Sequence, residues 1–162
     1  MEKKYRLTEE TVQITRNGKE ITLCRIEALR DFAIVKAGDK GGFIENEGNL
    51  SHDDNCWIYD NAKVFGNAKV HGDAKVYDSA KIYGNAKIYD NAAVLGAVNV
   101  SDNAWVFGNA TVFRCAKVSG NAEVFGRALV CGNALVCGNA EVFGFAKVYG
   151  TTKVCGNAAL FD

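Results

Sequence analysis

The chain has 162 residues, 48% of them hydrophobic, with 17 glycines and no proline. Its 19 basic and 19 acidic side chains cancel, and neither sign is concentrated in one part of the chain. Proteins that bind nucleic acid usually carry a basic face, so we expect no nucleic acid as a partner. The length fits one domain, or one repeat array with a small appendage.

No apolar segment follows the charged start of the chain, and no run is long enough to span a membrane. We therefore predict a cytoplasmic protein without a membrane partner, in which all six cysteines are reduced. Neither a Cys-x-x-Cys motif nor a zinc-ligand spacing of Cys and His occurs. The sequence predicts no metal site.

Residues 1–49 are predicted to form a β-hairpin cap with an irregular lead-in. Polar and apolar residues alternate in Thr11–Thr15 and Glu20–Leu23, and Asn17-Gly18 between them is a strong tight-turn signal. The first coil of a solenoid exposes unpaired backbone groups and an open core. We expect the hairpin to cover that end.

Residues 50–162 are predicted to form the second region, built from one six-residue pattern. From Cys56 onward the pattern has no insertion, and one unit reads Ala62-Lys63-Val64-Phe65-Gly66-Asn67. Its aliphatic position is Val, Ile or Leu in all eighteen units from Ile58 to Leu160. Self-similarity at a fixed period indicates a repeat architecture.

Each unit predicts a short strand followed by a corner. Ala and the aliphatic residue point to the same side, and Gly/Asp-Asn can turn because these residues tolerate positive φ. Three units per coil then give a triangular prism of about six coils with a filled interior. We expect it to begin irregularly near Gly42, with Ile44 and Leu50 in phase with the small position and His52 in an aliphatic position.

The repeat resembles the left-handed parallel β-helix of the hexapeptide-repeat, trimeric LpxA-like superfamily. Within it the chain looks most like the YdcK-like transferases, whose repeats read Gly-Asn-Ala-x-Val-Tyr. Leu29-Arg30-Asp31-Phe32 and Val35–Glu45 are similar to the lead-in of that group. The resemblance implies an all-β, single-stranded, left-handed β-helix, and the handedness comes from the resemblance alone. One departure is that an aromatic residue follows the aliphatic one here, where the acyltransferases usually place Gly.

Stacking every eighteen residues sorts the outward positions into three faces. The third face carries an aromatic strip, which monomers rarely leave to water. We expect it to contact a second copy or another protein, with shielding by ring stacking as the alternative. The residues expected to bind on this face are Tyr89, Trp105, Phe107, Phe125, Phe143 and Phe161. The first face adds Leu95 and Phe113, and the irregular corners add Arg114 and Arg127.

The second face carries several lysines, so we assign it to solvent. An unbroken asparagine column at its following corner is expected to hydrogen-bond from coil to coil; it comprises Asn67, Asn85, Asn103, Asn121, Asn139 and Asn157. Cys137 and Cys155 should lie side by side at a separation compatible with a disulfide. Their parallel Cβ directions and a reducing compartment argue against one.

The pattern is still running at Leu160-Phe161-Asp162. We expect an open C-terminal edge there, which favours end-to-end pairing of two prisms. Partners are therefore predicted to be a second copy, as a dimer or a trimer, and another protein in addition.

Two functions fit this reading. The first is a non-catalytic oligomeric scaffold that engages a protein partner through flat faces, for example as an inhibitor of a host or phage-defence factor, with no cofactor. The alternative, implied by the resemblance, is an acyltransferase using acyl-CoA. Such an enzyme needs a histidine base, and the chain has only His52 and His71. His71 is the catalytic candidate under this alternative, and we favour the scaffold because no carboxylate is recognisably placed to orient either ring.

Overall fold

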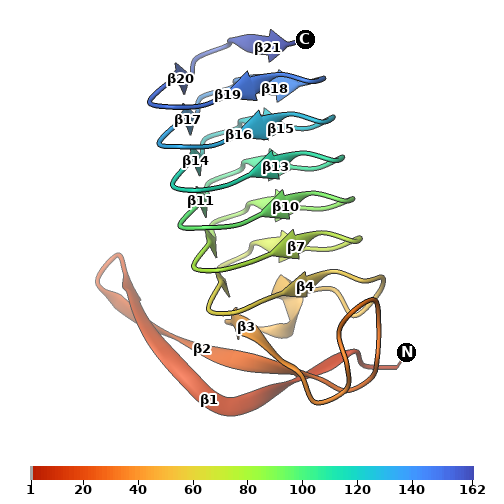
Figure 1. Ribbon diagram of the computed structural model, residues 1–162. Helices are drawn as coiled ribbons and strands as arrows, with labels where there is room; N and C mark the ends of the chain where they lie inside the picture. The colour runs from red at the N-terminus through yellow and green to blue at the C-terminus, as the bar shows by residue number, and fades with distance from the viewer. Residues whose placement is uncertain (1) are drawn as a thin grey trace.

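The computed structural model describes residues 2–162 and is built almost entirely of β-strands (Figure 1). A long hairpin, called the arm below, lies at the N-terminal end, and a stack of coils rises from it. The arm consists of β1 (Tyr5–Arg16) and β2 (Lys19–Ala28). The coils form a three-sided solenoid, which confirms the predicted all-β prism with a hairpin cap.

Three sheets form the three faces, and the strands of the coils run parallel in each of them. The arm strands β1 and β2 join the second sheet in antiparallel order. The first face contains β4 (Trp57–Ile58), β7 (Lys75–Val76), β10 (Ala93–Val94), β13 (Thr111–Val112), β16 (Leu129–Val130) and β19 (Lys147–Val148). The second contains β3 (Lys40–Ile44), β5 (Lys63–Val64), β8 (Lys81–Ile82), β11 (Asn99–Val100), β14 (Lys117–Val118), β17 (Leu135–Val136) and β20 (Lys153–Val154). The third contains β6 (Lys69–Val70), β9 (Lys87–Ile88), β12 (Trp105–Val106), β15 (Glu123–Val124), β18 (Glu141–Phe143) and β21 (Ala159–Phe161).

The interior of the prism is filled with small and aliphatic side chains. The aliphatic positions from Val64 to Val148 are at most 1% exposed, and the alanines between them are buried as well. Backbone N–H groups at alternate positions, such as those of Lys63 and Phe65, donate to carbonyls of the next coil, so hydrogen bonds between stacked coils satisfy the buried backbone. A ligand therefore has no room inside, and contacts must be made on the outer faces.

The first coil differs from the predicted phase. Ile44 pairs with Val64 and Leu50 with Val70, twenty residues apart instead of eighteen. Both residues therefore take aliphatic positions and not the small one, and two extra residues lie between Leu50 and Ile58. The coil includes a single turn of 3-10 helix, η1 (Glu47–Asn49), and brings the solenoid to about seven turns. His52 falls in the irregular stretch and is not in an aliphatic position.

Besides the antiparallel pairing of β2 with β3, the arm has two packing contacts with the prism. Its base closes the N-terminal end, where Tyr5 and Ile26 are fully buried and Tyr5 packs edge-on against Trp57. A register shift between Leu7 and Thr11 then bends the strand pair. The distal part lies on the outer side of the second face, where Phe65 is only 4% exposed. The assignment of the second face to solvent is thus wrong for its N-terminal half.

Cys137 and Cys155 form a disulfide, with their Cα atoms 4.5 Å apart. The prediction that all cysteines are reduced is wrong for this pair. The stacked coils hold the two Cα atoms at a distance that is compatible with a disulfide. The expectation that parallel Cβ directions would prevent the bond is therefore wrong. Cys24, Cys56, Cys115 and Cys131 are free. Among residues 2–162 we find no helix with the length and apolar character that a membrane crossing needs.

The corners show why Gly and Asp dominate their turn position. This position has positive φ in coil after coil, and Arg114, the one departure, follows it with φ 66°. A long side chain in the left-handed region costs about 1–2 kcal/mol relative to glycine's freedom there. Arg114→Gly is therefore expected to raise the free energy of unfolding by about 1 kcal/mol, measured by urea denaturation.

Arg127→Gly is the matched control for this prediction. Arg127 replaces the asparagine of another corner, and its guanidinium lies 5.7 Å from the ring centroid of Phe145 in the next coil. Glycine would remove that cation–π contact, so this variant should lose a little stability. An unchanged or lower stability of Arg114→Gly would contradict the strain argument.

Candidate binding faces

The third face carries an uninterrupted column of rings. The column begins at His71 and continues through Tyr89, Phe107, Phe125, Phe143 and Phe161. Neighbouring centroids are 4.8–5.0 Å apart, and the planes are within 17° of parallel. The rings thus shield each other's faces, as the ring-stacking alternative predicts. The first five side chains stay partly exposed, and Phe161 at the end of the column is 64% exposed.

A second row runs beside the rings, through the middle of the same face. Pairing of the strands places its residues in the order Lys69, Lys87, Trp105, Glu123, Glu141. Trp105 contacts the ring column edge-on, with its centroid 6.0 Å from that of Tyr89 and 6.4 Å from that of Phe107. Lys87 Nζ lies 5.1 Å from the centroid of Trp105. The row is basic at one end and acidic at the other.

The remaining predicted binding residues lie elsewhere. Leu95 and Phe113 follow β10 and β13 on the first face and are half-buried. Phe113 and Arg114 line a shallow cavity of about 480 Å³ together with Cys131 and the exposed Tyr149. Arg127 stands at the corner between the third and first faces. The structure therefore brings the six third-face residues together and leaves the other four apart from them.

His71 lies at the N-terminal end of the ring column. Its ring stacks on Tyr89 with centroids 5.0 Å apart. Partial burial, and then the positive charge of Lys87, lowers the pKa of His71, so the imidazole is neutral at pH 7. A neutral imidazole can accept a proton, which keeps His71 as the residue for the acyltransferase alternative.

His52 has a carboxylate partner that could not be recognised from the sequence. Its Nε2 lies 3.0 Å from Glu47 Oε1, and its Nδ1 accepts a hydrogen bond of 3.1 Å from the backbone N–H of Lys4. The ring also stacks on Tyr5 at 4.1 Å between centroids. Both nitrogens are occupied, so His52 fastens the arm to the first coil and has no lone pair free for a substrate.

A buried lysine beside His52 was missed by the sequence analysis. Lys4 has no exposed surface, and its Nζ donates to the carbonyl of Cys56 at 2.7 Å and to those of Asp53 and Asp54 at 3.3 and 3.4 Å. Burial lowers the pKa of Lys4 and raises that of Cys56. These three carbonyls lie in the first coil, in the stretch with the two extra residues, and they share the Lys4 ammonium group as a donor.

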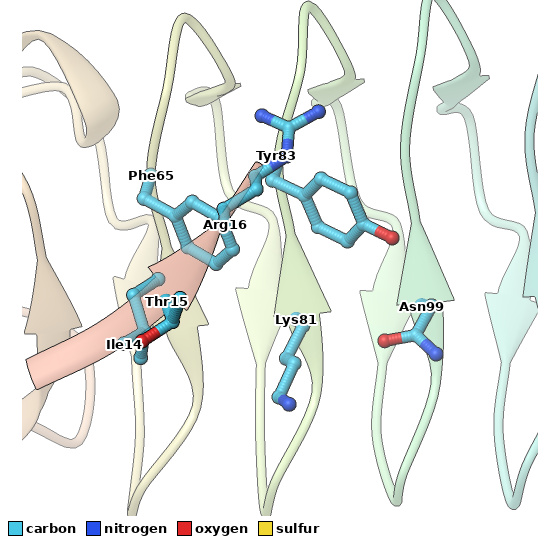
Figure 2. Close-up of a pocket in the computed structure, with 7 residues that line it drawn as sticks. All are labelled: Ile14, Thr15, Arg16, Phe65, Lys81, Tyr83 and Asn99. Carbon is cyan, nitrogen blue, oxygen red and sulfur yellow. The ribbon is translucent and has the colours of Figure 1, made fainter. Parts of the chain in front are cut away.

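The arm and the second face enclose a cleft of about 290 Å³ (Figure 2). Figure 2 shows the end of β1 lying over the sheet, with Arg16 beside Tyr83 and with Lys81 and Asn99 extending from neighbouring strands. The Arg16 guanidinium is 4.8 Å from the centroid of Tyr83. The complete lining is Ile14, Thr15, Arg16, Phe65, Lys81, Tyr83 and Asn99. The sequence analysis did not predict this position of the arm, because a contact between two distant segments leaves no repeating pattern in the sequence.

Comparison with known proteins gives one local similarity. The chain is 43% identical over 61 residues to the uncharacterized acetyltransferase YdcK of Escherichia coli strain K12. The matched stretch is 35% of this chain and 19% of the relative, so the chain matches about a fifth of that protein. No family model matches the chain. The stacked three-sheet coils and this similarity together fit a left-handed β-helix built from hexapeptide repeats, as the sequence resemblance predicted.

Proposed function

We propose that this protein is a non-catalytic binding scaffold that works as a homodimer through its third face. The observation that carries the proposal is the charge order of the middle row. Lys69 and Lys87 precede Trp105, and Glu123 and Glu141 follow it, one residue per coil. The row is therefore complementary to its own reverse.

Turning one copy end over end brings opposite charges together. The two-fold axis would lie in the interface, along the strand direction, at the height of Trp105, so that each row meets itself in reverse order. Lys87 then faces Glu123 of the second copy, and Lys69 faces Glu141. The two Trp105 side chains meet at the centre, where aromatic anchors contribute most to binding. The half-exposed ring edges leave water at the same time.

Parallel arrangements are disfavoured by the same row. Two or three prisms that run side by side in the same direction bring equal heights together. Lys87 would then contact Lys87 and Glu123 would contact Glu123, and like charges across an interface are unfavourable. The charge order therefore favours an antiparallel dimer over a trimer built on this face.

Reversing the charge at Lys87, alone and together with that at Glu123, tests the proposed dimer. In Lys87→Glu, two like-charge contacts replace two ion pairs because the interface is symmetric. We expect the dimer dissociation constant to rise about 100-fold, or about 1.4 kcal/mol for each contact. The double variant Lys87→Glu/Glu123→Lys restores the pairs in the opposite sense and should recover most of the affinity. Sedimentation equilibrium over a concentration series measures both.

Lys75→Glu is the control, because Lys75 occupies the same strand position on the first face. It should leave the dissociation constant unchanged. A wild-type chain that is monomeric at every concentration, or a double variant no better than the single one, would refute the antiparallel dimer. Charged substitutions at Leu160 and Phe161 test the competing end-to-end contact. If they dissociate the dimer and Lys87→Glu does not, the contact lies at that edge.

Acetyl transfer is the second candidate, favoured by the similarity to YdcK. Under this alternative the chain would use acyl-CoA, and His71 would be the base, since its pKa is lowered and His52 has both nitrogens occupied. Purified protein is incubated with acetyl-CoA and a panel of amines and sugars, and release of free thiol is followed. Turnover that is lost in His71→Ala and kept in His52→Ala would favour the enzyme over the scaffold.

A cytoplasmic location and a further protein partner also remain proposals. The Cys137–Cys155 bond makes the location testable, because a reducing cytoplasm keeps such pairs as thiols. Alkylation in intact cells followed by mass spectrometry reports their state. Fully alkylated thiols would support the cytoplasm, and an intact disulfide would argue against it.

A further inference from the structure

We infer that the edge of β1 that faces away from β2, called the free edge below, accepts an extended, acidic segment of another protein as an added β-strand. The inference goes beyond the third-face dimer and does not depend on it, because β1 belongs to a different sheet. Within residues 2–162, the distal part of β1 pairs with β2 on one side and with no strand on the other. An unpaired strand edge is a template for pairing with another chain.

The register of the hairpin indicates which backbone groups of β1 are available. Arg16 and Lys19 close the two-residue turn of the arm, and such a closing pair is hydrogen-bonded. Hydrogen-bonded and non-hydrogen-bonded pairs then alternate along an antiparallel ladder. Thr11, Gln13 and Thr15 therefore direct their N–H and C=O groups away from β2. These donors and acceptors form one row along the free edge.

The distal part of β1 lacks the features that usually prevent strand addition. Natural edge strands carry charges, a proline or a bulge. Residues 11–15 read Thr-Val-Gln-Ile-Thr, without a charge or a proline. The register shift of this strand lies before them, between Leu7 and Thr11. The free edge can therefore accept a strand along residues 11–15.

The cleft of about 290 Å³ lies beside the free edge (Figure 2). Its wall on the arm comes from Ile14, Thr15 and Arg16 of β1, and none of its lining residues belongs to β2. The cleft is therefore on the side of β1 that faces away from β2. A strand added to β1 would run about 4.8 Å from it, over a floor on the second face. The floor consists of Phe65, Lys81, Tyr83 and Asn99.

Charge in the cleft favours an acidic segment. Arg16 and Lys81 line it, none of the lining residues carries a carboxylate, and neither cation forms an ion pair within residues 2–162. Glu20, opposite Thr15 on β2, is exposed and does not line the cleft. Every second side chain of an added strand points to the floor. A carboxylate there would pair with Lys81 or Arg16, and an apolar neighbour would pack on Tyr83.

A capped, fluorescent hexapeptide, Thr-Val-Thr-Glu-Thr-Val, tests the charge preference by fluorescence polarisation with the whole protein. As a strand it presents valine and glutamate on one side and threonine on the other. We expect a Kd below about 1 mM, and at least about tenfold weaker binding when lysine replaces the glutamate. Lys81→Gln should weaken binding of the acidic peptide about tenfold, the usual effect of losing one charged hydrogen bond. Lys147→Gln, at the same strand position of the first face, should leave it unchanged.

Gln13→Pro tests the backbone contact with the same peptide. Proline removes an N–H that points to the free edge and places its ring there, while the pairing with β2 is kept. Peptide binding should be lost, whereas Gln13→Ala keeps the N–H and should bind as the wild type does. Thr22→Pro is the matched control, because Thr22 pairs with Gln13 and its N–H points to the opposite edge of the hairpin. It should bind normally, and circular dichroism confirms that each variant is folded.

The assignment is overturned if the wild type does not bind the acidic peptide at millimolar concentration, or if the lysine peptide binds equally well. It is also overturned if Gln13→Pro binds normally, or if Thr22→Pro loses as much affinity as Gln13→Pro. If no peptide binds but Gln13→Pro weakens self-association, the free edge serves a second copy instead. Lys87→Glu should not change peptide binding, so a failure of the third-face dimer can be told from a failure of this assignment.

Discussion

Replacing Lys4 by methionine is expected to lower the free energy of unfolding by about 3 kcal/mol. Methionine fills the space of the lysine stem but cannot donate a hydrogen bond. The carbonyls of Asp53, Asp54 and Cys56 would then lose their shared donor. Buried groups left without partners cost about 1–3 kcal/mol each, and water entering the corner would recover part of this. Urea denaturation followed by circular dichroism measures the change.

Lys3→Met is the matched control for Lys4→Met. Lys3 is the neighbouring lysine, and its ion pair with Glu47 is solvent-exposed, with side-chain exposures of 62% and 40%. Exposed pairs contribute little to stability, so this variant should unfold almost as the wild type does. If both variants lose the same free energy of unfolding, the hydrogen bonds of Lys4 do not stabilise the first coil.

The difference between wild type and Lys4→Met should also depend on pH. Burial lowers the pKa of Lys4 from its ordinary value of 10.5, so the unfolded chain binds this proton more tightly than the folded one does. Stability contributed by Lys4 therefore rises as the pH increases from the folded pKa towards 10.5. The gap between the two proteins should widen across that interval. A constant gap would contradict a buried, protonated Lys4.

Opening the Cys137–Cys155 disulfide is the second change with a large expected effect. The bond closes a loop with a sequence separation of 18. Loops of about this size restrict the unfolded chain enough to contribute about 3 kcal/mol. The double variant Cys137→Ser/Cys155→Ser should lose roughly that amount, and reduction of the wild type should have the same effect.

The loss should be confined to one end of the solenoid. Each coil of a repeat protein contacts only its neighbours, so stability is largely local. Hydrogen exchange of β17 and β20 should accelerate while that of β5 and β8 stays slow. Cys131→Ser, which removes a free thiol of the same region, is the control and should leave exchange unchanged. Exchange that accelerates uniformly would mean that the chain unfolds as one cooperative unit.

The regular coils could be predicted from sequence because one physical cause acts at each position. An aliphatic residue every six positions fills the core, and Gly or Asp supplies the positive φ of the corner. Asn17-Gly18 likewise predicted the turn between the two strands of the arm. These signals are local, so a single sequence reveals them. The number of faces then follows from the period.

The first coil and the arm could not be predicted in the same way. The two residues inserted after Leu50 interrupt the period, and nothing in the local pattern marks them as an insertion. The pairing of His52 with Glu47 depends on that irregular path. Docking of Arg16 against Tyr83 joins residues far apart in the chain. Such contacts depend on tertiary packing, which composition and spacing do not encode.

For a related reason, only one of the two rows on the third face could be predicted from the sequence. The ring column was recognised because its members share one residue type. The row from Lys69 to Glu141 mixes lysine, tryptophan and glutamate, and its meaning lies in the order of charges along the stack. Only the observed pairing of the strands turns that order into a surface that complements its own reverse.

One corner of the prism also limits which residues can occupy it. The side chains of Asn67, Asn85, Asn103, Asn121 and Asn139 each donate Nδ2 to the Oδ1 of the next coil, at 3.0–3.2 Å. All five bonds run in the same direction, so every member between Asn67 and Asn157 donates a hydrogen bond on one side and accepts one on the other. Aspartate, which serves at the adjacent turn position, can only receive, whereas the amide of asparagine does both. Within residues 2–162 the other two corners form no such chain of side-chain amides, and their equivalent positions include Ser79, Cys115, Arg127 and Phe145. This column is therefore a line of aligned dipoles with a head and a tail, and it gives the prism an electrical polarity along its axis.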